Sequence, residues 1–209
     1  MVKQERAART RETLMQAAAE FFDRDGYGTT TLSRISKAAG ISMGALTFHF
    51  PTKDDLADAV QVRGGTITRD ALDRVAVDPD RPLRVLVGVT LELARLLEKE
   101  AIVRAAARLT RERRSTSADW PATWLPTVER LLESATGHDL RQGIDPKAVQ
   151  ALVVHLLTGA EAQIRCATSG ARDPSESAES QLSDIWHVVL RGVADGTRTQ
   201  GRGEDELVS

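Results

Sequence analysis

Apolar residues recur three or four positions apart along most of the chain, which is the pattern of helices that bury one face. The segment 83–97 is apolar on nearly every side, so we expect other helices to cover it all round as the central helix of a second domain. The pattern therefore predicts an all-α fold. The long helices are expected over residues 6–24, 53–75, 83–97, 101–111, 126–134, 146–170 and 174–196.

Two short helices joined by a glycine corner are predicted ahead of the second long helix. Thr30 is expected to cap the first, and Gly40 to end it in the left-handed conformation. Ser42 is expected to cap the second, which spans about residues 42–49 and ends because Pro51 cannot continue it. Its inward face is formed by Ala45, Leu46 and Phe50. This arrangement predicts a helix-turn-helix, although two short helices and a turn also occur in ordinary helical bundles.

The other side chains of the second short helix point away from this core and are candidate DNA contacts. Between Thr31 and Lys53 the chain has three basic residues and no acidic one, so this surface is locally positive. Lys53 falls in the first turn of the next helix, where backbone amides and an ammonium group together suit a phosphate oxygen. The residues predicted to contact DNA are Thr30, Thr31, Arg34, Ser42, Met43, Gly44, Thr47, His49 and Lys53.

Charge is distributed unevenly along the chain. Residues 1–53 carry eight Lys and Arg against five Asp and Glu, whereas the remaining residues carry 20 against 25, for a net charge of -2. A basic head on an acidic body suits a protein that binds a polyanion with one end. The single cysteine, Cys166, excludes an internal disulfide and fits a reducing cytoplasm. Because no apolar run reaches the roughly 20 residues that cross a bilayer, the sequence predicts a cytoplasmic protein with no membrane partner.

The sequence contains no pattern that predicts an enzyme. It has no Ser-His-Asp signature, phosphate-cradling glycine loop or paired-carboxylate motif. His138, His155 and His187 lack partners at metal-ligand spacing, so neither a metal nor another cofactor is predicted. A purely structural helical scaffold is an alternative, which salt-dependent binding to duplex DNA would exclude.

The segment 78–82, DPDRP, is the clearest break between helices. Gly64 and Gly65 lie within the preceding helix and weaken it by about 1 kcal/mol each relative to alanine. We therefore expect a soft point there, between the head and the body of the protein. The predicted division is a helix-turn-helix domain over residues 1–53, a helical ligand-binding and dimerisation domain over 54–196, and a disordered tail over 197–209.

Two strings in the chain resemble known regulators. The run GISMGALTFHFPTKDDLADAV, preceded by RTRETL and by Gly26-Tyr27, resembles the tetracycline-repressor family of bacterial transcription regulators. The strings GAL-x-FHF and R-x-x-x-R-L-T are similar to those of the γ-butyrolactone autoregulator receptors of streptomycete-type bacteria. The resemblance implies a homodimeric repressor with an N-terminal reader of an operator and a C-terminal domain that binds a small effector. It also implies a phosphate contact for His49, which matches a family position with that role.

A tryptophan marks the predicted effector pocket. The spacing W-x6-LL-x2-A, which begins at Trp124, matches the helix that carries a pocket tryptophan in the receptors. Trp120 has no such match, and the alternative for both rings is ordinary core filling. The predicted pocket walls are Val85, Val89, Leu93, Leu109, Trp124 and Val128, around a small and mostly apolar molecule.

The last two long helices resemble the pair through which the family dimerises, with four helices packed across a two-fold axis. The alternative is that their apolar stripes serve only the core of one subunit. The residues predicted to form the dimer interface are Val149, Leu152, Val153, Leu156, Ala160, Ile185, Trp186 and Val189.

Two positions depart from the receptor pattern. The receptors usually have a tyrosine where this chain has Thr47 and a basic residue where it has Met43, so two phosphate contacts are missing. The string GALTFHF resembles the pseudo-receptors, relatives that respond to antibiotics or pathway intermediates. The sequence therefore predicts a ligand-responsive repressor of secondary metabolism that is released from a pseudo-palindromic operator. The alternatives are an orphan regulator without a butyrolactone ligand and a ligand-binding helical protein with weakened or lost DNA binding.

Overall fold

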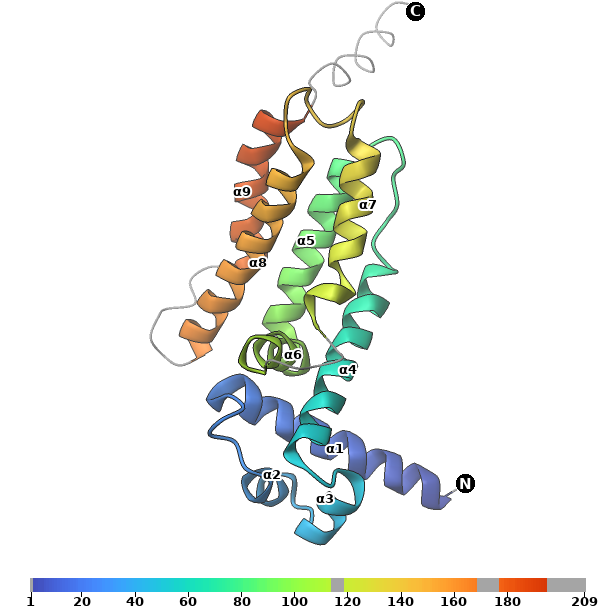
Figure 1. Ribbon diagram of the computed structural model, residues 1–209, viewed down its shortest axis with the longest axis vertical. Coiled ribbons are helices and arrows are strands. Elements are labelled where there is room, and N and C mark those ends of the chain that lie inside the picture. The colour runs from blue at the N-terminus through green and yellow to red at the C-terminus, as the bar shows by residue number, and fades with distance from the viewer. Residues whose placement is uncertain (1, 114–118, 169–176, 195–209) are drawn as a thin grey trace, which may run out of the picture.

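The computed structural model describes residues 2–113, 119–168 and 177–194 (Figure 1). These ranges are all-α, as predicted, with one short 3-10 turn and no strand. The helices are α1 (Val2–Asp25), α2 (Leu32–Ala39), α3 (Met43–His49), α4 (Lys53–Leu72), α5 (Pro82–Lys99), α6 (Ala101–Glu112), η1 (Pro121–Thr123), α7 (Leu125–Ala135), α8 (Pro146–Thr168) and α9 (Ala178–Val193).

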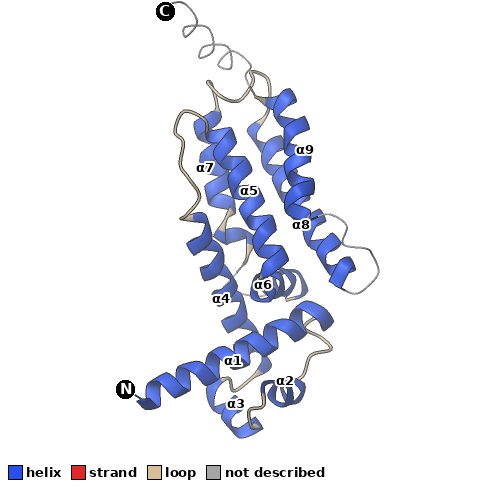
Figure 2. Cartoon of the chain, turned by 180° about the vertical axis from the view of Figure 1, so that it is seen from behind, coloured by secondary structure: helices blue, strands red, loops and turns tan. Residues whose placement is uncertain are grey.

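The helices form an elongated molecule with two parts (Figures 1 and 2). The head consists of α1, α2, α3 and the first half of α4, and the body is a bundle of α5, α7, α8, α9 and the second half of α4. Helix α4 runs from one part into the other, and α6 crosses the junction. A movement of α4 or α6 therefore changes how the head sits on the body.

Each part has its own hydrophobic core, and α4 and α6 contribute to both. Leu56 and Val60 of α4 lie in the head core, whereas Ala71 of the same helix lies in the body core. The predicted domain boundary after Lys53 stays a prediction, but the two cores meet inside a continuous helix. Helix α6 turns Ile102, Ala105 and Leu109 to the head, and Val103, Ala106 and Ala107 to the body.

The start of α2 differs from the prediction in one residue. Thr31, not Thr30, is the N-cap of α2, and its side chain accepts a hydrogen bond from the backbone N–H of Arg34. Thr30 is fully buried, and its hydroxyl donates to the carbonyl oxygen of Gly26 at 2.7 Å. Three consecutive threonines made either residue a possible cap, and burial of Thr30 under the end of α1 decides between them.

The other helix ends around α2 and α3 follow local sequence rules, and the predictions for Gly40 and Ser42 are confirmed. Gly40 ends α2 with a φ of 65°, in the left-handed region that favours glycine. The Ser42 hydroxyl accepts from the N–H of Ala45 at the start of α3. Thr52 and Asp55 form a reciprocal capping box that begins α4.

Gly64 and Gly65 serve close helix packing. Helix α4 continues unbroken through both, and both are buried. A Cβ atom at Gly64 would lie 2.6 Å from the Cβ of Ala106 on α6, and one at Gly65 would lie 2.9 Å from Cγ2 of Thr123. Both distances are too short for carbon atoms, so glycine is needed for α4 to approach α6 and η1. The expected soft point is thus a close contact between α4 and α6, the helix that crosses the junction of the two parts.

Replacing Gly64 with alanine is expected to destabilise the protein by about 1–3 kcal/mol, because the added methyl overpacks the α4–α6 contact. Gly44, on the exposed surface of α3, has no atom within 4 Å of an added Cβ, so its replacement by alanine is expected to be neutral or to stabilise by up to about 1 kcal/mol. Urea denaturation of both variants at one protein concentration measures the difference. Equal free energies of unfolding for the two variants would contradict the packing role.

Two further observations concern the described ranges. Within them no helix is both long and apolar enough to cross a membrane, and no group of three or more His, Cys, Asp and Glu side chains is placed to hold a metal ion. Helix α9 begins at Ala178 with Ser177 as its cap. The predicted start of the last helix at residue 174 and the predicted tail over 197–209 lie outside the described residues.

Candidate DNA-binding interface and effector domain

Helix α3 presents one face to solvent at the end of the head (Figure 1). Leu46 is fully buried, and Phe50, just past the end of α3, is nearly so; both anchor the reader on the head core. The predicted outward residues are exposed apart from His49, which is half-buried. The exposed residues of this face are Ser42, Met43, Gly44, Thr47 and Phe48.

The hydroxyl groups on this face differ in what they can offer DNA. The Ser42 oxygen accepts from Ala45 N–H at 3.3 Å, which leaves the hydroxyl hydrogen available for a phosphate. The Thr47 hydroxyl donates to the carbonyls of Met43 and Gly44 at 3.1 and 3.2 Å, so its hydrogen is committed to its own helix. Thr47 can thus present its methyl group to a base but gives up an internal bond if it donates to a phosphate.

Phe48 is the site residue that the sequence predictions missed. Its side chain is the most exposed large apolar group of the described residues, at 82%, and its ring meets His49 edge-on at 5.4 Å between centroids. Helical spacing could have found it, because a residue midway between the inward Leu46 and Phe50 lies on the opposite face of the helix. An exposed aromatic ring beside a hydroxyl and an imidazole suits contact with a base edge.

Arg34 is held in a fixed position on the surface of the head. Its guanidinium stacks on the Phe21 ring at 4.8 Å and pairs with Asp25 at 2.7 Å. Asp25 also pairs with Arg24, and these two guanidinium groups, Arg24 foremost, lower the pKa of the Asp25 carboxyl. The charge of Arg34 is therefore partly neutralised.

Lys37, by contrast, is exposed and makes no ion pair with a described residue, so it is the free cation of α2.

Lys53 and Thr30 have roles inside the head. The Lys53 ammonium donates to the carbonyls of Tyr27 and Thr30 at 2.8 and 3.1 Å and lies 4.0 Å from the centroid of the Tyr27 ring. It therefore ties the connection between α1 and α2 to the start of α4, and its contact with phosphate stays a prediction. The prediction for the Thr30 side chain is wrong, because a fully buried hydroxyl cannot reach DNA.

Polar side chains of α6 grip the end of α1. Arg104 pairs with Asp23 at 2.6 Å, and both side chains are nearly buried, at 12% and 11% exposed. Arg108 donates to the carbonyl of Asp23 at 2.6 Å, and Glu112 accepts from the backbone N–H of Tyr27 at 2.6 Å. Three successive turns of α6 thus contact the end of α1 and the start of the connection to the helix-turn-helix, α2 and α3.

The same helix also reaches the start of α4. Arg113, at the end of α6, donates to Asp54 and Asp58 of α4 at 2.8 and 2.7 Å. The hydrogen bond from the Tyr27 hydroxyl, followed by the one from Arg113, lowers the pKa of Asp54. On its opposite side, Arg111 pairs with Glu161, a nearly buried residue of α8. Helix α6 therefore connects α8 with both helices that carry the reader.

The predicted pocket residues separate into two groups. Val89, Leu93, Trp124 and Val128 lie in the body core, and Val85 is buried on the same helix as Val89. Their role as pocket walls stays a prediction. The prediction for Leu109 is wrong. It lies in the head core, because α6 buries opposite faces in the two parts and Leu109 is on the face toward α1.

The two neighbouring tryptophans differ in their hydrogen bonds. The Trp120 indole N–H donates to the Thr68 hydroxyl at 2.9 Å, and its ring meets that of Trp124 edge-on at 5.7 Å. The Trp124 ring is 2% exposed, and its indole N–H makes no hydrogen bond with a described residue. A buried N–H without an acceptor costs about 1–3 kcal/mol of folding free energy. A ligand with a carbonyl oxygen could accept a hydrogen bond from the Trp124 indole and recover this cost.

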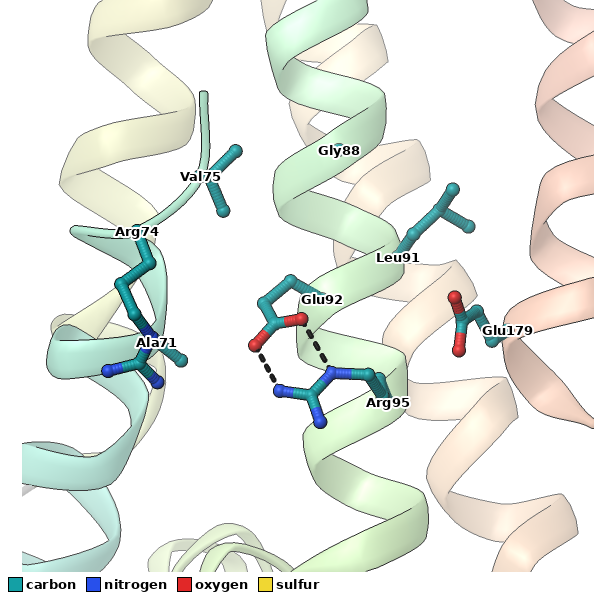
Figure 3. A pocket seen from close by; sticks show the side chains of 8 residues that line it. All are labelled: Ala71, Arg74, Val75, Gly88, Leu91, Glu92, Arg95 and Glu179. Atoms are coloured by element: carbon teal, nitrogen blue, oxygen red, sulfur yellow. Dashed lines mark hydrogen bonds and ion pairs between the residues drawn. The ribbon is translucent and has the colours of Figure 1, made fainter. Parts of the chain in front are cut away.

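Two cavities flank the end of α4 and the middle of α5. One has a volume of about 450 Å³ and is bordered mainly by apolar side chains, including the predicted Val85 and Val89. The other has a volume of about 400 Å³ and a charged lining (Figure 3). Trp124 borders neither. The second cavity is lined by Ala71, Arg74, Val75, Gly88, Leu91, Glu92, Arg95 and Glu179.

The apolar stripes of α8 and α9 serve mainly the core of their own subunit. The predictions for Val149, Val153, Ala160 and Trp186 are wrong as written, because these side chains are 0 to 3% exposed within the body core. Leu152, Leu156 and Val189 are half-buried, and Ile185 is 40% exposed. The outer face of the pair carries other apolar groups, among them Val154 at 37% and Val188 at 73% exposed.

Known proteins resemble this chain in sequence and in fold. Residues 14–60 match the model of bacterial regulatory proteins of the tetR family. Over 93% of its length the chain is 28% identical to the A-factor receptor protein of Streptomyces griseus, of which it covers 67%. A γ-butyrolactone receptor, an ArpA-like protein, has a crystal structure similar at a TM-score of 0.72, with 30% identity and 92% of each chain covered. CprB from Streptomyces coelicolor, solved in complex with its biological operator sequence, gives the same TM-score of 0.72, identity of 30% and coverage of 92% of each chain.

Proposed function

Because this chain belongs to the tetR family of bacterial regulatory proteins, we propose that it is a homodimeric repressor released from its operator by a small apolar effector. It acts in the cytoplasm on double-stranded DNA and controls genes of secondary metabolism. The observation that carries the proposal is the acid-free face of α3, held on a rigid head and gripped by α6. Two copies of this face would enter successive major grooves of a pseudo-palindromic operator.

On the operator, the side chains of the reader divide by what they offer. The Phe48 ring and the Thr47 methyl suit the methyl group of thymine. The Ser42 hydroxyl, the Lys37 ammonium and the His49 imidazole suit phosphate oxygens, which position the helix without reading the sequence. Thr31 and Arg34 lie beside them on α2, and Met43 and Gly44 are small or apolar enough for close approach.

The second subunit would pack on the outer faces of α8 and α9. Val154, Ile185 and Val188 supply exposed apolar contacts there, and the half-buried Leu152, Leu156 and Val189 flank them. Glu161 of α8 contacts Arg111 of α6. A change in the packing of the dimer would thus reach α6, which holds the head of its own subunit.

The effector would bind in the body, and Trp124 supports this site. A γ-butyrolactone, the ligand class named for the relatives, offers a lactone carbonyl that could accept from the buried indole N–H. An antibiotic or pathway intermediate with a carbonyl would serve equally. Release follows if the effector binds more tightly to a form of the dimer in which the two heads no longer fit the operator. A tenfold loss of operator affinity needs a difference of about 1.4 kcal/mol in the free energy of effector binding to the two forms.

The deciding experiment is binding of the purified protein to the DNA upstream of its own gene over a salt series, with and without a butyrolactone or an extract of the producing cells. Binding that falls steeply with salt supports an operator reader. Release by butyrolactone identifies an autoregulator receptor, and release by the extract alone identifies a relative that senses another molecule. Equal affinity for this DNA and for random DNA would contradict repression of its own gene.

A second function is favoured by the chemistry of α3. The committed hydroxyl of Thr47 and the uncharged Met43 remove two phosphate contacts, which fits a ligand-binding protein with weakened DNA binding. Such a protein would bind effector yet show no salt-dependent preference for any natural promoter.

Replacing Phe48 with alanine is expected to weaken operator binding by roughly tenfold, because an apolar contact with a base is lost. Binding to random DNA should stay unchanged, because Phe48 carries no charge. Fluorescence anisotropy with operator and random duplexes measures both affinities. Lys37→Ala is the matched control, since losing a phosphate contact weakens both and lowers the salt slope by about 1. An equal loss on both duplexes in the Phe48 variant would argue against base reading.

A further inference from the structure

The two cavities beside the end of α4 share one lining residue. Val75, three residues past the end of α4, borders both of them. Its Cγ1 atom lies 3.5 Å from the position of a Cβ at Gly88, so it rests against bare backbone on α5 (Figure 3). Because Val75 lies in the connection between α4 and α5, its side chain can turn aside without breaking a helix.

The larger cavity suits an apolar body. It lies under the connection between α4 and α5, and its volume of about 450 Å³ is in the range of small-molecule sites. Its charged lining residues, Asp73, Asp78 and Arg130, are exposed. Its other polar lining residues are the exposed Ser134 and the half-buried Thr127. Its apolar lining residues are Leu72, Val75, Val77, Pro79, Pro82, Val85, Val89 and Leu131.

The smaller cavity contains two charged groups, Arg74 and Glu179, that make no hydrogen bond or ion pair with a described residue. Arg95 holds Glu92 through two hydrogen bonds, one of them 2.7 Å long between Nε and Oε2 (Figure 3). Glu179 faces them from α9 and adds a second negative charge near Arg95. The guanidinium of Arg74, on the far side of Glu92, makes no hydrogen bond or ion pair with a described residue. Arg74 adjoins Val75, the residue that both cavities share, whereas Glu179 lies on α9 (Figure 3). A ligand that reaches past Val75 therefore lies next to the guanidinium, and an anionic group is the chemistry that this end of the cavity can satisfy.

We propose that the two cavities are halves of one effector site for an elongated amphiphilic carboxylic acid, joined when Val75 turns away from Gly88. The apolar body lies under the α4–α5 connection, and the carboxylate pairs with Arg74. This inference rests on the proposed effector-controlled function and adds a site that is separate from Trp124. An occupant would contact α4, α5, α7 and the start of α9, so it would act directly on the helix that leads to the head.

The test uses decanoate and decanol, which share an apolar body and differ in the charged group. Equilibrium dialysis of the full-length protein below the micelle concentration gives both affinities. Decanoate is expected to bind about tenfold more tightly than decanol, and Arg74→Gln is expected to remove that difference without changing decanol. Arg84→Gln, an exposed position on α5 that lines neither cavity, is the matched control. Val75→Phe, which fills the passage, should weaken decanoate at least about fivefold.

Equal affinities for decanoate and decanol, no binding of either, or equal effects of the Arg74 and Arg84 variants would each overturn the inference. Operator binding is measured on the same samples. A protein that binds its operator but does not distinguish the two probes refutes this site alone. One that distinguishes the probes as expected but ignores the operator supports this site and refutes the repressor function.

Discussion

Replacing Val188 with aspartate is expected to convert the dimer into monomers and to weaken operator binding by at least about 100-fold. Val188 is 73% exposed in one subunit, so the charge is solvated in the monomer and the subunit should keep its fold. In the proposed dimer the substitution would place two carboxylates in a buried interface, at a cost of several kcal/mol. A monomer would hold one half-site only and lose the gain from binding two at once. Analytical ultracentrifugation and anisotropy on the operator measure the two effects.

Val62 provides a matched control, because it is 54% exposed on α4, away from α8 and α9. Val62→Asp is expected to leave both the dimer and operator affinity unchanged. A Val188→Asp protein that stays dimeric and binds its operator normally would show that the outer face of α9 is not the interface. Loss of dimer in both variants would point to general damage and would also contradict the proposal.

The reader could be predicted in detail because its signals are local. A helix cap acts over about three residues, so Ser42 and Gly40 identify their own helix ends from sequence alone. Thr30 shows the limit of that method, since choosing among adjacent threonines depends on packing under α1. Phe48 was within reach of the method, because helical spacing alone places it opposite Leu46.

The body was harder to predict because helical spacing identifies a buried face but not what covers it. The apolar stripes that contain Val149 and Val153 on α8 and Trp186 on α9 have the same spacing whether they face their own subunit or a partner. Leu109 was misplaced for a related reason, because α6 buries opposite faces in two different cores. Gly64 had a signal, but its meaning depends on Ala106, a residue on another helix.

The contacts between α6 and the head could not be predicted from any local sequence pattern. Arg104 and Asp23 are 81 residues apart in sequence, and each looks like an ordinary charge on a helix surface. Only the fold brings them together and excludes water from both. The attraction between the two charges falls steeply if α1 and α6 shift relative to each other. The pair therefore couples the position of the head to that of α6, and so links an effector in the body to the DNA-binding helices.

Replacing Asp23 with alanine is expected to cost about 3–5 kcal/mol of folding free energy, because it leaves the guanidinium of Arg104 buried without its counter-charge. The remaining bonds from Arg104 to the carbonyls of Leu97 and Glu98 place the loss at the lower end of that range. Urea denaturation at one fixed protein concentration measures the loss, since the stability of a dimer depends on concentration. The double variant with Arg104→Met should recover part of it, because no buried charge is then left unpaired.

Asp25→Ala is the matched control for this prediction. Asp25 pairs with Arg24 and Arg34, whose side chains are 61% and 46% exposed, so its removal is expected to cost less than about 1 kcal/mol. The Asp23 variant should also need more effector to release the same fraction of operator, because α6 then holds the head less firmly. Equal stability losses in the two aspartate variants, together with unchanged effector release, would mean that the Arg104–Asp23 pair neither stabilises nor couples the two parts.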